Sequence, residues 1–212
     1  MIMAKQISML RVIAGKFKGR KLLKPDSKDI RPTRDIVKEA LFNILGPGIA
    51  GMSFLDLYAG TGSVGIEACS RGASEVVFCE LKEDAIGVLE KNLANLDIAD
   101  SCRVVKGDVM SVLSARYALN RSFDIVFMDP PYRDDLAKKT LNAICVYDII
   151  APQGLALCEH YAEEDLPEVI GCLSLLEKRR YGNSAISFYR KVSAASEKVE
   201  ADEKGSGLSR DI

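Results

Sequence analysis

Short apolar runs alternate with segments of helical periodicity from about residue 53 to residue 160. Within one such segment, Ile86, Leu89, Leu93 and Leu96 recur at the three- and four-residue spacing of a single helix face. Strands that alternate with helices form a parallel sheet covered on both faces, which binds ligands at the carboxyl ends of its strands. The pattern predicts strands at 53–58, 75–80, 102–107, 123–128 and 153–160, and helices at 63–71, 83–96, 109–117 and 134–146.

Different patterns flank this alternating region. The stretch "RPTRDIVKEALFNIL" predicts an amphipathic helix with Thr33 as N-cap, and Gly46 and Pro47 end it. In "LSLLEKRRYGNSAISFYRKV", two extended runs meet at Gly182, which predicts an antiparallel hairpin that completes the sheet. After Val192 the apolar residues are too few to build a core, so we expect a disordered tail at 193–212.

The charges are sorted along the chain, although the formal net charge is only -1. Residues 1–38 hold 11 Lys and Arg against 3 Asp and Glu, which leaves 18 against 27 for the remainder. Within the basic part, "RVIAGKFKGRKLL" reads as two short strands joined by a Gly-containing turn. A basic ribbon beside an acidic body suggests a phosphate-rich partner. We therefore divide the chain into a basic N-terminal extension and hairpin at 1–30, a main domain at 31–192 and the tail.

Composition excludes several other classes of protein. With 212 residues, the chain can build one main core. No apolar run approaches the roughly 20 residues that span a bilayer, and the N-terminus does not resemble a signal peptide. The 6 cysteines never form a C-x-x-C pair. We expect a cytoplasmic monomer with no membrane contact, no disulfide and no metal.

The first chemical motif is the glycine-rich turn in "FLDLYAGTGSVGIEA". Gly60, Gly62 and Gly65 match G-x-G-x-x-G between a predicted strand and a predicted helix, and Glu80 ends the next strand. Alone, this pattern fits a dinucleotide site. Asp56, just before the turn, would repel a pyrophosphate but suits the ammonium and sulfonium groups of S-adenosylmethionine (SAM).

Two further acids extend that hypothesis. Glu80 could bind the ribose hydroxyls, and Asp108, at the end of the third predicted strand, could reach the adenine amino group. A single acid after a strand is often only a helix cap, and Asp108 before Val109 fits that alternative best.

The second motif, Asp-Pro-Pro-Tyr, follows the apolar run "FDIVFM". A buried strand delivers Asp129 to the carboxyl edge of the sheet, and the prolines remove N–H donors there, so the site presents acceptors. Such a site can receive the amino group of a base on the Asp129 carboxylate and the Pro130 carbonyl, while Tyr132 stacks on the ring. The alternative is a rigid turn with a buried tyrosine, which gives no reason for the glycine turn upstream.

These segments together resemble the RsmD family, the bacterial 16S rRNA (guanine(966)-N(2))-methyltransferases, over roughly residues 10–191. The resemblance rests on "RVIAGKFKGRKL", "IRPTRDIVKEALFNIL", the glycine turn, "FDIVFMDPPY" and "KRRYGNSAISFYR". It implies a Rossmann-like class I SAM-dependent methyltransferase fold with a seven-stranded sheet whose last strand is antiparallel. It also implies methylation of one guanine amino group within the 30S subunit or its assembly intermediate. Residues before Leu10 and the acidic tail depart from the family pattern.

The resemblance also assigns roles to residues. It places Asp129, Pro130 and Tyr132 in catalysis. The expected cofactor-binding residues are Asp56, Tyr58, Gly60, Gly62, Glu80, Leu81, Asp108 and Val109. The expected RNA-binding residues are Arg11, Lys16, Lys18, Arg20, Lys21, Arg31 and Arg34.

Three other functions remain open at this point. An amino-group methyltransferase acting on DNA or on a glutamine side chain would use the same Asp-Pro-Pro-Tyr motif. A nicotinamide oxidoreductase would use the glycine turn, but Asp56 and the proline motif argue against it. A non-catalytic RNA-binding assembly factor would need only the basic hairpin. His160, the single histidine, reads as structural, and the basic run at 178–180 is equally compatible with RNA contact and with an ordinary exposed strand.

Overall fold

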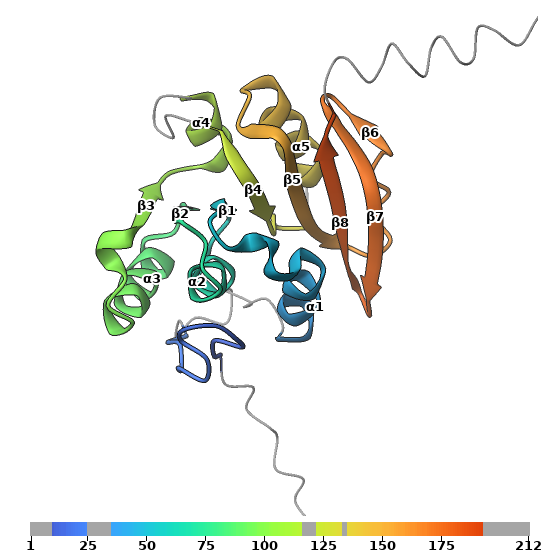
Figure 1. Cartoon of the computed structure of the whole chain (residues 1–212). Coiled ribbons are helices and arrows are strands. Elements are labelled where there is room, and N and C mark those ends of the chain that lie inside the picture. The colour runs from blue at the N-terminus through green and yellow to red at the C-terminus, as the bar shows by residue number, and fades with distance from the viewer. Residues whose placement is uncertain (1–9, 25–34, 116–121, 133–134, 193–212) are drawn as a thin grey trace, which may run out of the picture.

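A computed structural model describes residues 10–24, 35–115, 122–132 and 135–192. These residues contain an eight-stranded sheet in the order β3-β2-β1-β4-β5-β8-β7-β6, with helices on both faces (Figure 1). Strands β1 to β5 run parallel to one another, as the alternating pattern predicts. Their bounds are β1 Ser53–Leu57, β2 Glu75–Glu80, β3 Cys102–Lys106, β4 Phe123–Met128 and β5 Ile150–Tyr161.

An antiparallel hairpin completes the sheet. Strand β8 (Ser184–Lys191) lies between β5 and β7 (Leu173–Tyr181) and is antiparallel to both. The predicted turn at Gly182 is therefore confirmed. The described sheet has one strand more than the predicted seven, because the two-residue strand β6 (Val169–Ile170) pairs with β7 at the edge. Two residues are too few to produce a detectable alternation.

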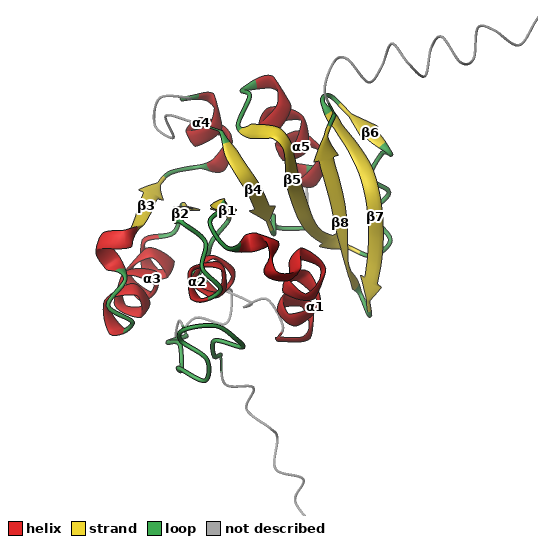
Figure 2. Ribbon diagram, in the orientation of Figure 1, coloured by secondary structure: helices red, strands yellow, loops and turns green. Residues whose placement is uncertain are grey.

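Helices cover the two faces of the sheet unequally (Figure 2). Helices α1, α2 and α3 pack on one face, and α4 and α5 pack on the other. Single-turn 3-10 segments, Gly46–Ile49 and Ala99–Ser101, follow α1 and precede β3. The helices are α1 Asp35–Leu45, α2 Ser63–Ser70, α3 Glu83–Asn95, α4 Val109–Ser114 and α5 Leu136–Val146.

The alternation of side chains along each strand separates two hydrophobic cores. Phe54, Phe78 and Phe127 point toward α1, α2 and α3, whereas Leu55 and Val77 point toward α4 and α5. Because residues two apart in a strand share a face, Asp56 and Glu80 project on the same face as the three phenylalanines. Asp129 directly follows β4, so all three acids lie at the same edge of the sheet.

The basic N-terminal segment forms the predicted antiparallel pairing over a short length. The Leu22 N–H donates to the Leu10 carbonyl at 2.9 Å and the Val12 N–H donates to the Arg20 carbonyl at 3.0 Å, on either side of a bridge between Arg11 and Lys21. This pairing is too short to make regular strands within residues 10–24. The segment lies beside α2, between α1 and α3 (Figure 1). The predicted N-cap Thr33, Arg31, Arg34 and the tail at 193–212 lie outside the described residues.

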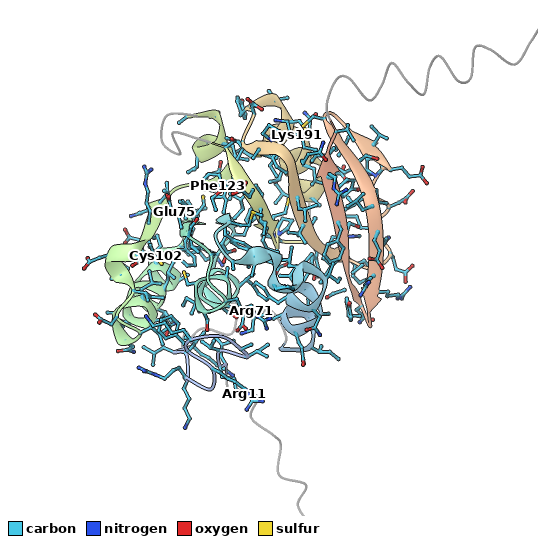
Figure 3. All side chains as sticks on the ribbon, viewed as in Figure 1. Arg11, Arg71, Glu75, Cys102, Phe123 and Lys191 are labelled. Carbon is cyan, nitrogen blue, oxygen red and sulfur yellow. The ribbon has the colours of Figure 1, made fainter. Side chains whose placement is uncertain are left out.

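The strand starts and ends define two opposite edges of the sheet. Figure 3 labels Glu75, Cys102 and Phe123, which begin β2, β3 and β4, and Lys191, which ends the antiparallel β8. These residues mark the amino edge. The glycine turn and the Asp-Pro-Pro-Tyr segment leave the carboxyl edge on the opposite side.

Candidate active site

The turn after β1 adopts a left-handed backbone that glycine makes possible. Gly60 and Gly62 have φ angles of 55° and 79°, and Tyr58 also has a positive φ of 62°. A Cβ atom on Gly62 would lie 2.2 Å from Leu89 Cδ1. Side chains are therefore excluded here both by backbone conformation and by the approach of α3. The result is a tight turn that leads into α2 at the carboxyl edge of the sheet.

Glu80 connects this turn to the end of β2. One carboxylate oxygen accepts a hydrogen bond from the Gly60 N–H at 2.7 Å, and the other accepts from the N–H groups of Leu81 and Lys82 at 2.9 and 2.8 Å. The side chain is 9% exposed. A carboxylate offers about four acceptor sites, so Glu80 can hold the turn and still accept from about one hydroxyl group of a ligand.

Asp56 lies beneath the same turn. Its Oδ2 accepts a hydrogen bond from the Gly65 N–H in the first turn of α2 at 2.8 Å, and the residue is 1% exposed. Burial raises the pKa of Asp56 from 3.8 to about 7; the Gly65 hydrogen bond opposes this rise, and the nearby Glu80 charge adds to it. A carboxylate whose ionisation is this unfavourable gains most from a cationic ligand.

The other predicted cofactor residues lie around this centre. Tyr58 is held by a hydrogen bond between its hydroxyl and Thr140 Oγ1 at 2.8 Å, and burial raises its pKa. Leu81 is 58% exposed, whereas Val109, the first residue of α4, is buried in the core. Asp108 caps α4 by accepting from the Ser111 N–H at 3.0 Å. The cap alternative for Asp108 is therefore correct, although the exposed side chain also remains a candidate for the adenine amino group.

The Asp-Pro-Pro-Tyr segment leaves β4 beside the end of β5. Asp129 is partly exposed and Pro130 is buried, whereas Tyr132 is 47% exposed, so the predicted alternative of a buried tyrosine is wrong. The Tyr132 hydroxyl lies 3.1 Å from Ser184 Oγ at the start of β8. The segment thus spans from β4 across β5 and presents both a carboxylate and an aromatic ring at the carboxyl edge.

A buried polar network attaches the basic segment to α2. Glu67, fully buried on α2, accepts from the N–H groups of Ile13 and Ala14 at 2.7 and 2.9 Å. The buried Lys38 ammonium on α1 lies 3.9 Å from Glu67 and donates to the Arg11 carbonyl at 2.8 Å. Sequence reasoning missed both residues; an acid inside the apolar face of α2 was the available signal.

A second set of contacts involves the far end of the segment. Asn92, 1% exposed on α3, accepts from the Leu23 N–H at 2.7 Å and donates to the Leu23 and Thr61 carbonyls. Since Thr61 belongs to the glycine turn, Asn92 joins the segment directly to the candidate cofactor site.

The basic side chains of this segment remain at the surface. All five predicted RNA-binding residues within the described ranges are exposed; they are Arg11, Lys16, Lys18, Arg20 and Lys21. In addition, Arg20 donates to the Asn95 carbonyl at 2.6 Å, and the Lys16 ammonium lies 5.2 Å from the Phe17 ring centroid. Figure 3 places Arg11 on the outer side of the segment, with Arg71 between it and the sheet.

The weaker candidates have ordinary structural partners. His160 is fully buried, its ring nitrogens lie 2.9 Å from the Tyr161 carbonyl and from Ser187 Oγ, and burial lowers its pKa to about 4. Arg179 pairs with Glu177, and Arg180 pairs with Glu163. A neutral, hydrogen-bonded His160 agrees with its predicted structural role.

The fold and the site together define a class. A sheet in this order with a glycine turn after β1, acids at the ends of β1 and β2, and an antiparallel final strand is the class I SAM-dependent methyltransferase fold. The chain belongs to the RsmD family: the family model described as "Conserved hypothetical protein 95" matches residues 10–190. The predicted family and fold class are therefore confirmed.

Individual relatives agree with this assignment. Ribosomal RNA small subunit methyltransferase D of Escherichia coli K12 is 38% identical over 182 residues, covering 86% of this chain and 90% of the relative. The putative rRNA methyltransferase YlbH of Bacillus subtilis is 37% identical, covering 86% and 99%. The solved putative methyltransferase yhhF from Escherichia coli superposes with a TM-score of 0.77 at 37% identity, covering 86% and 98%. Among the described residues, no helix is both long enough and apolar enough to cross a membrane.

Proposed function

We propose that this protein transfers a methyl group from SAM to the N2 amino group of one guanine in 16S rRNA, within the 30S subunit or its assembly intermediate. The observation that carries the proposal is the position of Asp129, which directly follows β4 and so leaves the edge of the sheet at which Asp56 and Glu80 lie. Methyl donor and amino acceptor would then meet at one place. The rRNA methyltransferase names of the relatives support the substrate class.

The residues around the glycine turn fit the cofactor chemically. SAM supplies an activated methyl group on a sulfonium, and it carries an ammonium group and a ribose diol. Asp56 provides a buried negative charge that a cation would stabilise. Glu80 keeps about one acceptor site beyond those that hold Gly60, Leu81 and Lys82, with which it would accept from a ribose hydroxyl.

The Asp-Pro-Pro-Tyr segment would prepare the amino group. The lone pair of an exocyclic base nitrogen is delocalised into the ring, which makes the nitrogen a poor nucleophile. The Asp129 carboxylate and the Pro130 carbonyl would accept its two hydrogens and favour a pyramidal nitrogen whose lone pair points to the methyl group. Tyr132 would hold the extruded base by stacking. Alignment of this kind can lower a barrier by about 7–11 kcal/mol, and the product proton would pass to Asp129 or water.

Transfer of labelled methyl from SAM to 30S subunits that lack the modification tests this function. Nucleoside analysis should give N2-methylguanosine at a single site. Asp129→Ala should bind SAM as the wild type does and lose at least a hundredfold in turnover, while exposed Asp100→Ala should retain it. Wild-type turnover in Asp129→Ala would remove Asp129 from the mechanism. Label in DNA or protein but in no rRNA would replace the proposed substrate.

A further inference from the structure

Two tyrosines at the ends of neighbouring strands contact each other at the carboxyl edge of the sheet, beside the candidate active site. Tyr132 follows β4 and Tyr161 ends β5, and their ring centroids lie 6.2 Å apart with the planes tilted by 47°. Their side chains remain 47% and 44% exposed. A pair of large aromatic residues that stay half-exposed while touching each other forms an apolar corner open to solvent.

The sheet places this corner beside the reacting groups. Strands β4 and β5 are parallel, with Met128 opposite Cys158, so Asp129 and Tyr161 leave the same edge of the sheet. Leu157 belongs to the core on the face of α1, α2 and α3, and alternation puts Tyr161 on that face as well. Tyr161 therefore lies at the sheet edge that Asp129 leaves and on the face that carries Asp56 and Glu80.

Ser184 fixes the geometry of the corner. It is the cross-strand partner of Tyr161 in the β5–β8 ladder, and its hydroxyl lies 3.1 Å from the Tyr132 hydroxyl. The Tyr132 ring is thus tethered at its hydroxyl end to the strand that lies beside Tyr161.

We propose that Tyr161 is a substrate-binding residue that forms the second wall of the base site, with Tyr132 as the first. This inference rests on the proposed function. The tilt means that one extruded guanine cannot lie flat on both rings; it stacks on the face of one ring and meets the other at its edge, an arrangement that aromatic groups favour. The corner also fixes the rotation of the base about the stacking axis, so that its amino group faces Asp129.

Steady-state kinetics on unmodified 30S subunits test the proposal. Removal of one stacking ring is expected to raise the KM for the subunit roughly fivefold to a hundredfold in Tyr161→Ala, because base stacking on an aromatic ring contributes on this scale. Affinity for SAM and the midpoint of thermal unfolding should stay at their wild-type values. Tyr161→Phe should restore the KM, since stacking needs the ring and not the hydroxyl. Val169→Ala, at another exposed apolar residue, on the edge strand β6, is the control.

A double-mutant cycle provides the second measurement. If both rings hold one base, the effects of Tyr132→Ala and Tyr161→Ala on kcat/KM should fall short of additive in the double variant. Strictly additive effects, or an unchanged KM in Tyr161→Ala, would overturn the role of Tyr161 while wild-type methylation continued. Absence of methyl transfer by the wild type would instead overturn the proposed function itself.

Discussion

Substitution of Asp56 tests whether the same buried charge lowers the stability of the free protein and strengthens its binding of SAM. The folded protein protonates Asp56 near pH 7, whereas the ordinary pKa of 3.8 applies once the chain unfolds. Between these values the folded state binds more protons than the unfolded state, so the free energy of unfolding decreases as pH rises. The contribution of Asp56 protonation to the free energy of unfolding is therefore fully present below about pH 4 and is lost by about pH 7.

The magnitude follows from the same pKa values. Each pH unit within the window changes the free energy of unfolding by about 1.4 kcal/mol, and the whole window therefore corresponds to ~4 kcal/mol. Asp56→Asn removes the ionisation, while the amide oxygen can still accept from the Gly65 N–H. We expect the variant to gain stability over the wild type progressively from pH 4 to pH 7 and then to keep a constant advantage.

Urea unfolding followed by circular dichroism at several pH values measures this difference, since the chain has no tryptophan. Exposed Asp100→Asn controls for the loss of one carboxylate. We also expect Asp56→Asn to bind SAM at least tenfold more weakly, because the charge that destabilises the free protein is the one that a cation would stabilise. A difference between variant and wild type that stays flat across the window would refute the reasoning.

Two further predictions concern the basic segment. Glu67→Gln should lower the free energy of unfolding by about 3 kcal/mol in urea titrations, because it removes the carboxylate charge from the buried Lys38 ammonium; an unchanged midpoint would contradict this. Neutralising the exposed cations should weaken RNA binding and reduce its salt slope by roughly one for each phosphate group that is no longer bound. The matched control combines Arg103→Glu with Lys139→Glu, which lowers the net charge by the same amount outside the segment. An unchanged salt slope in the segment variant would mean that the segment has another role. The cations to be replaced by Gln are Lys16, Lys18, Arg20 and Lys21.

The sequence predicted those features that depend on neighbouring residues. The period-two and period-3.6 patterns identify β1 to β5 and the helices between them within a few residues, because burial of one face acts on each segment separately. The left-handed turn at Gly60 and Gly62 was likewise recognisable, since only its local backbone needs glycine. Placement of the catalytic and cofactor residues in a shared site remains a prediction that the proposed experiments test.

Interactions between distant segments could not be predicted in the same way. Residues 10–24 contain an alternation that suggests strands, yet several of their backbone donors bind side chains of α2 and α3 instead of a partner strand. The pairs Ile13–Glu67 and Leu23–Asn92 are separated by 54 and 69 residues, and no local pattern signals them. The antiparallel pairing is therefore limited to residues 10–12 and 19–22, and tertiary hydrogen bonds attach the residues around it to the helices.

The way in which this segment docks separates attachment from recognition. Glu67, Ser70 and Asn92 bind the segment through its backbone: Glu67 holds two N–H groups, Ser70 Oγ accepts from the Phe17 N–H at 2.9 Å, and Asn92 holds Leu23. A Cβ on Gly15 would lie 1.9 Å from the Ser70 carbonyl oxygen, so the backbone is in direct contact with α2. Because these anchors use no basic side chain of the segment, its exposed cations can face phosphates. Of these anchors, Glu67 and Ser70 lie on α2, which follows the glycine turn, and Asn92 lies on α3, which contacts it. An RNA bound by the segment would therefore be held in a fixed position relative to the cofactor site.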